Sequence, residues 1–166
     1  QEDRPIVGIA EIAEGRFPSQ LGFSGVPIAV LRFPGKAFAQ GVKIELIVRG
    51  VCGIRPGIKG TSENIHVRSV MGRFLEHTRI VYFHNDDVPD ILCGSADWME
   101  RNLLRRNESC FEIRQKRLKD QILQDLELYL ADNCQAWRLL GDGSYERLRE
   151  GARKPFLIHD YMFSNG

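Results

Sequence analysis

The sequence predicts a mixed α/β domain in which a sheet is flanked by helices. Short segments of alternating apolar and polar residues, typical of strands, recur through the middle of the chain. One long segment nearer the C-terminus repeats its apolar residues with the period of a helix. Loops rich in glycine and proline separate these segments. At 166 residues, the chain has the length of one domain with a substantial core.

Strands are expected throughout the middle of the chain. In KIELIVRG, residues 43–50, apolar residues alternate with polar ones before a closing glycine. If it is extended, the segment 65–77 places His66 and Arg68 on one face. The other expected strands are 27–33, 79–83, 90–95, 108–113, 135–140 and 144–148.

Two helices are expected in the C-terminal third. The longer one, residues 114–131, has an apolar stripe formed by Leu118, Ile122, Leu126, Tyr129 and Leu130. Its first turn is basic and its later turns are acidic, which opposes the helix dipole. We interpret this as a solvated face; the alternative is a basic turn that faces a polyanion. FLIHDYM, residues 156–162, predicts a short terminal helix.

Composition and charge exclude several classes of protein. The formal net charge of +1 does not support a broad nucleic-acid-binding face. No stretch reaches the roughly 20 apolar residues that span a bilayer. The four cysteines are widely spaced and include no C-x-x-C pair, so we expect free thiols of a cytoplasmic protein rather than a zinc site. Because the first residue is Gln and not Met, we expect a fragment of a longer protein.

The residues that suggest chemistry lie in RFLEHTRIVYFHNDDVPDILCGSADWMERNLLRR, residues 73–106. In an extended segment, His77 and Arg79 point to the same side and place a titratable imidazole beside a permanent cation. The next expected strand ends in Gly94 and Ser95, where a ligand can approach backbone N–H groups closely. Phosphoryl transfer needs such cations and donors, together with a group that gives or takes a proton. The sequence therefore predicts a phosphate site around His77.

The neighbouring polar residues have simpler explanations. His66, His84 and His159 are expected to be hydrogen-bonded or surface residues. Glu76 could orient an imidazole, but adjacent residues of a strand face opposite sides, so we expect a surface role. Asp97 is expected to cap the segment that follows it.

The order H-x-R, then G-S, then N is a loose match to the H-x-K…G-S…N motif of phospholipase D enzymes. A more specific pattern lies in the blocks VRG, RPG, SEN, RS, GRFLEH, GSADWM and RN, with their order and spacing. These blocks closely resemble the C-terminal part of the long bacterial polyphosphate kinase, from about Ala37 to about Met162. Residues 1–36 do not match this family and are expected to be an irregular segment before a domain at 37–166. An upstream frame disruption and a truncated gene are two explanations for that segment.

The resemblance implies the second phospholipase-D-like domain of an enzyme that transfers the terminal phosphate of ATP to polyphosphate, reversibly. In this family a first such domain, absent here, carries the histidine that becomes phosphorylated and the positions linked to Mg²⁺. Carried over by motif, His77 assists proton transfer and Arg49 contacts the nucleotide phosphates. Further phosphate contacts are expected from Arg68, Arg79 and Arg106. No metal ligand is expected in this chain.

The resemblance further implies ATP, ADP and polyphosphate as ligands and a homo-oligomer for the complete enzyme. It implies a cytoplasmic location, with a membrane-associated complex as the alternative. The fragment alone is expected to be inactive. Two other classes stay open: a phosphodiesterase of the phospholipase D type and a non-catalytic polyphosphate-binding module. The presence of Arg79, where the phospholipase D motif has a lysine, argues against the phosphodiesterase.

Overall fold

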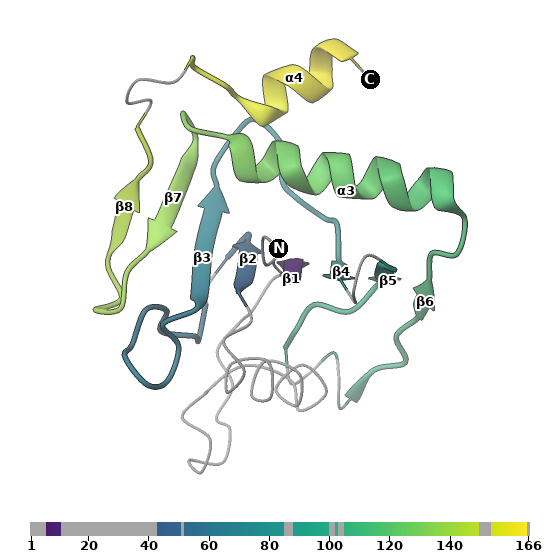
Figure 1. Ribbon diagram of the computed structural model, residues 1–166, viewed down its shortest axis with the longest axis horizontal. Helices are drawn as coiled ribbons and strands as arrows, with labels where there is room; N and C mark the ends of the chain where they lie inside the picture. The colour runs from purple at the N-terminus through teal and green to yellow at the C-terminus, as the bar shows by residue number, and fades with distance from the viewer. Residues whose placement is uncertain are drawn as a thin grey trace.

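The structure, a computed structural model, describes residues 6–10, 43–50, 52–84, 88–99, 102, 105–149 and 154–165. Within these ranges the chain forms one eight-stranded sheet, and helices α3 and α4 lie on one side of it (Figure 1). The strands are β1 (Ile6–Ala10), β2 (Ile44–Val48), β3 (Ile65–Val70), β4 (Ile80–Phe83), β5 (Asp90–Gly94), β6 (Cys110–Glu112), β7 (Ala136–Leu139) and β8 (Tyr145–Arg147). The helices are α3 (Lys116–Ala131) and α4 (Ile158–Asn165).

The strands lie in the order β6-β5-β4-β1-β2-β3-β7-β8. The three central strands β1, β2 and β3 are parallel to one another, whereas every other neighbouring pair is antiparallel. All five residues of β2 are buried, as expected for a central strand covered on both faces. The mixed sheet with flanking helices that the sequence predicts is confirmed.

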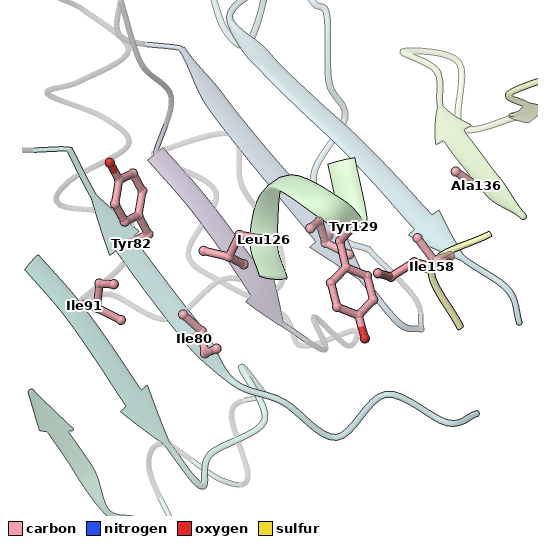
Figure 2. Close-up of a cluster of buried hydrophobic side chains, with 9 residues drawn as sticks. Ile80, Tyr82, Ile91, Leu126, Tyr129, Ala136 and Ile158 are labelled. Carbon is pink, nitrogen blue, oxygen red and sulfur yellow. The ribbon is translucent and has the colours of Figure 1, made fainter. Parts of the chain in front are cut away.

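The side chains of the strands form two separate hydrophobic clusters, one on each face of the sheet. In β2, Ile47 belongs to the cluster under the helices, while Ile44 and Leu46 belong to the other cluster. This division follows from the alternation of side chains along a strand. Figure 2 shows the cluster under the helices, where Leu126 of α3 faces the side chains of β4 and β5 and Tyr129 lies beside Ile158 of α4. Its labelled members are Ile80, Tyr82, Ile91, Leu126, Tyr129, Ala136 and Ile158.

Asp132, directly after α3, connects the end of that helix to β7 and to α4. Its side chain is buried, and its Oδ1 atom accepts hydrogen bonds from three successive backbone N–H groups, those of residues 134–136. Its Oδ2 atom accepts the N–H of Ile158, the first residue of α4, at 3.0 Å. One carboxylate thereby fixes where α4 begins.

Most of the expected elements are present at the expected places. The strands expected from 43–50 to 144–148 appear within a few residues, and both expected helices begin about two residues late, at Lys116 and Ile158. The segment expected at 65–77 divides, because β3 ends at Val70 and the chain then leaves the sheet. The strand expected at 27–33 lies outside the described residues.

The irregular character expected for residues 1–36 does not extend to Ile6–Ala10. These residues form β1, which pairs with β2 on one side and β4 on the other. This central strand was not predicted from the sequence. Of the helices that the structure describes, none has the length and apolar character needed to cross a membrane.

Candidate active site

The candidate site is built on the segment between β3 and β4, residues 71–79, which holds the GRFLEH block. His77 is exposed near the end of this segment, and Arg79, directly before β4, is buried. The Nη1 atom of Arg79 lies 2.6 Å from Nδ1 of His77 and also donates to the carbonyl oxygen of His77. The predicted meeting of His77 and Arg79 is therefore found, although both residues lie outside a strand.

The contact with Arg79 decides which nitrogen of His77 carries the proton. A guanidinium group has donors and no acceptor, so Nδ1 of His77 must be the acceptor. In the neutral imidazole the proton then lies on Nε2. The contact with Arg79 therefore makes Nε2–H the hydrogen-bond donor of the neutral His77 ring.

The charge of Arg79 is balanced by Asp97, which follows β5. The Nη2 atom of Arg79 and Oδ1 of Asp97 form an ion pair, and the two side chains are only 7% and 14% exposed. The Asp97 carboxylate accepts this guanidinium hydrogen bond, and the cap expected of Asp97 stays a prediction. The ion pair with Arg79 was not predicted from the sequence.

Arg49, directly after β2, reaches the same segment from the centre of the sheet. Its Nη1 atom donates to the carbonyl oxygen of Glu76 at 2.6 Å. Because Glu76 precedes His77, the structure brings Arg49, His77 and Arg79 together along residues 76–79. Three of the five site residues proposed from the sequence therefore contact the same short segment.

No hydrogen bond among the described residues joins the other two arginines to this contact group. Arg68, on the helix side of β3, donates through Nη1 to the carbonyl oxygen of Leu130 in α3 at 2.6 Å. Burial lowers the pKa of the Arg68 guanidinium, and the neighbouring carboxylates of Glu45 and Asp132 oppose that effect. Arg106 is exposed, and the described part of the chain holds no hydrogen bond between it and the His77 ring. Phosphate binding by Arg68 and Arg106 stays a prediction.

The G-S and N elements of the sequence pattern meet at the carboxylate of Glu108, which was not predicted to belong to the site. Ser95 donates through its hydroxyl to Oε2 of Glu108 at 2.5 Å, and Asn102 donates through Nδ2 to Oε1 of the same residue at 3.2 Å. The N–H of Ser109 donates back to the Ser95 hydroxyl at 3.0 Å. Asn102 is buried, so this network holds the chain after β5 in place.

Glu76 has a buried role rather than the surface role we expected. Its Oε1 atom lies 2.6 Å from the Tyr129 hydroxyl and 2.6 Å from Nε2 of His159. The Glu76 side chain is only 13% exposed. Glu76 therefore does orient an imidazole, but that imidazole is His159 of α4 and not His77. His159 is buried and hydrogen-bonded, as expected.

The described residues contain no group of three or more His, Cys, Asp and Glu side chains able to hold a metal ion. Their donors around His77 are guanidinium groups and an imidazole, which suit an anion and not a cation. The arrangement around His77 can bind phosphate charge and donate a hydrogen bond to it through the imidazole. The cysteines are free thiols, with Cys110 exposed and the other three, Cys52, Cys93 and Cys134, partly buried.

Comparison with known proteins gives a consistent result. Residues 34–157 match the family model described as polyphosphate kinase C-terminal domain 2. The chain is 56% identical over 119 residues to a polyphosphate kinase of Pseudomonas aeruginosa, which covers 72% of this chain and 17% of that protein. It is also 56% identical over 113 residues to a polyphosphate kinase of Xylella fastidiosa, covering 68% of this chain and 16% of that protein.

A solved structure supports the same relationship. The crystal structure of polyphosphate kinase from Porphyromonas gingivalis superposes with a TM-score of 0.81 and 28% sequence identity, covering 98% of this chain and 23% of that one. The chain therefore spans about a sixth of the length of the curated relatives that it matches.

Proposed function

Because the chain belongs to the polyphosphate kinase family through its C-terminal domain 2, we propose that it is part of an ATP:polyphosphate phosphotransferase. In this proposal it forms the second phospholipase-D-like domain and transfers no phosphate without the remaining domains. The observation that carries the proposal is the contact of the His77 ring with Arg79, while Arg49 binds the carbonyl oxygen of the preceding residue, Glu76. An imidazole and two guanidinium groups gathered on one short segment suit a phosphate substrate.

His77 acts as a hydrogen-bond donor in this mechanism. Its Nε2–H donates to the phosphate oxygen on which negative charge develops as the bond to the transferred phosphoryl group breaks, and the proton stays on the ring because Nδ1 is occupied by Arg79. Removal of one such donor typically costs about 10²–10³-fold in rate. The phosphorylated histidine that the family resemblance implies would come from another domain, so this chain contributes this donor and the cations.

The two arginines have different parts in this mechanism. Asp97 offsets the charge of Arg79, so we assign Arg79 to the orientation of the His77 ring. Arg49 is assigned to the negative charge of the transferred phosphate. Arg68 and Arg106 are retained as further phosphate contacts, made when longer stretches of polyphosphate are bound.

The ligands and setting follow from family membership. We propose ATP, ADP and polyphosphate as ligands, a cytoplasmic location and a homo-oligomeric complete enzyme. Mg²⁺ accompanies ATP in phosphoryl transfer and neutralises phosphate charge when it is bound. The family resemblance puts the positions linked to Mg²⁺ in the first phospholipase-D-like domain, and we assign its ligands there.

A domain exchange tests the proposal. Residues 34–166 of this chain would replace the matching domain of the Pseudomonas aeruginosa polyphosphate kinase, which keeps its own preceding residues. Polyphosphate formation from ATP would be measured for the exchanged enzyme and for its His77→Ala variant. We expect His77→Ala to lower kcat by about 10²-fold or more, because a donor to the developing phosphate charge is lost. His66→Ala, at an exposed histidine of β3, is the matched control and should leave kcat unchanged. Near-normal turnover of the His77 variant would refute the assigned role.

A further inference from the structure

The contacts around Glu76 extend the site into the helical layer. We propose, on the premise of the function above, that Glu76 is a positioning residue through which α3 and α4 set the places of Arg49 and His77. It touches no substrate in this proposal. It acts by fixing the backbone from which the site is built.

The first support is that both helices hold one oxygen of Glu76. Tyr129 of α3 and His159 of α4 each place a donor 2.6 Å from its Oε1 atom. Tyr129 is 53 residues away along the chain and His159 is 83 residues away. The carboxylate therefore joins three segments that no local interaction would bring together.

The protonation of the two partners fits this role. Nδ1 of His159 accepts the backbone N–H of Phe74 at 3.2 Å, so in the neutral ring the proton lies on Nε2 and points at Glu76. Burial, and then the hydrogen bond to Glu76, raise the pKa of the Tyr129 phenol, which stays a donor. Both partners thus donate to a carboxylate, an arrangement that requires no shared proton.

The second support is that the backbone of Glu76 lies within the site. Its carbonyl oxygen accepts the Arg49 guanidinium at 2.6 Å, and the next residue is His77. The residues before it are largely exposed: the exposed fractions of Met71, Phe74 and Leu75 are 62%, 45% and 76%. In this exposed segment, the largely buried carboxylate of Glu76 fixes the chain close to His77.

Gly72 gives independent support, because it permits the segment to approach α4. A Cβ atom at Gly72 would lie 1.9 Å from Nδ1 of His159, a distance at which one of the two groups must move. The glycine of the GRFLEH block therefore leaves room for the imidazole that holds Glu76. The GRFLEH block and α4 therefore pack closely at Gly72 and His159.

The experiment removes one hydroxyl and observes the His77 ring directly. The histidine rings of the ¹⁵N-labelled 166-residue chain would be recorded by NMR for the unmodified chain and for Tyr129→Phe. Tyr82→Phe is the matched control, since Tyr82 is also buried under α3 but its hydroxyl bonds His84. We expect the ring nitrogen signals of His77 to move in Tyr129→Phe and to stay in place in Tyr82→Phe.

In the exchanged enzyme, Tyr129→Phe should lower kcat by about 10-fold with little change in the KM for ATP, since small misplacements of a site group cost up to ~10²-fold. His159→Gln, which keeps an N–H donor, should retain more activity than His159→Leu. Unmoved His77 signals in Tyr129→Phe, or equal movement in both tyrosine variants, would overturn the positioning role. These NMR results do not depend on kinase activity, so they separate this failure from failure of the proposed function, which His77→Ala tests.

Discussion

At the level of single residues, the ion pair between Arg79 and Asp97 shows how the site combines stability with chemistry. Arg79 is only 9% exposed, and a guanidinium buried to this extent needs a counter-charge. Asp97 supplies that charge, while the remaining Arg79 hydrogen bonds go to His77. The Arg79 guanidinium therefore forms a buried ion pair with Asp97 and also selects the tautomer of the His77 imidazole.

We expect Asp97→Ala to lower the free energy of unfolding by about 3–5 kcal/mol, because it leaves the Arg79 charge buried without its partner. Asp97→Asn should cost less, since the amide oxygen still accepts a hydrogen bond. Glu146→Ala is the control: the Arg138–Glu146 pair is about half exposed, and such pairs contribute about 0–1 kcal/mol. Urea denaturation followed by circular dichroism measures all three. Equal losses in Asp97→Ala and Glu146→Ala would contradict the buried-pair interpretation.

At the level of elements, α3 owes its stability to packing more than to its own ends. It has no side-chain cap at its N-terminus, no acidic residue in its first turn and no basic residue in its last. Arg68 of β3 instead provides a donor for the carbonyl oxygen of Leu130. A neighbouring strand thus supplies part of what the helix sequence lacks, and burial of Leu126 and Tyr129 fixes the helix to the sheet.

Leu126→Ala should therefore destabilise the protein strongly, by about 2–5 kcal/mol, because it opens a cavity between α3 and the sheet. Leu118→Ala lies on the same helix at a position that is 41% exposed, and its effect should stay within about 0.5 kcal/mol. Chemical denaturation of both variants measures the difference. Similar losses would show that the helix is held by its own sequence and not by the sheet.

At the level of the whole molecule, β1 joins the two sides of the sheet. It pairs in parallel with β2 and antiparallel with β4, so it connects the parallel centre to the β4-β5-β6 side. Arg49 follows β2 and Arg79 precedes β4, which places β1 between the strands that carry two of the site cations. Loss of β1 would leave two inner strands with unpaired backbone groups.

Removal of residues 1–10 should consequently abolish cooperative thermal unfolding and make the chain sensitive to proteolysis. Removal of residues 164–166, at the end of α4, is a control that should leave the transition in place. Calorimetry and limited proteolysis compare the two truncated chains. A truncated chain without β1 that still unfolds cooperatively at the original temperature would show that the sheet closes without it.

The sequence by itself determined the fold class, the strands from β2 to β8 and both helices, because alternation and helical period act over a few neighbouring residues. It also determined the family, through ordered blocks, and the nearness of His77 and Arg79, which are two residues apart. Only the tertiary structure decided the place of β1 and the partners of Asp97 and Glu76. Those partners are Arg79, 18 residues away, and His159, 83 residues away. Such contacts depend on how the strands and helices assemble, and no local pattern records which buried donor will meet which carboxylate.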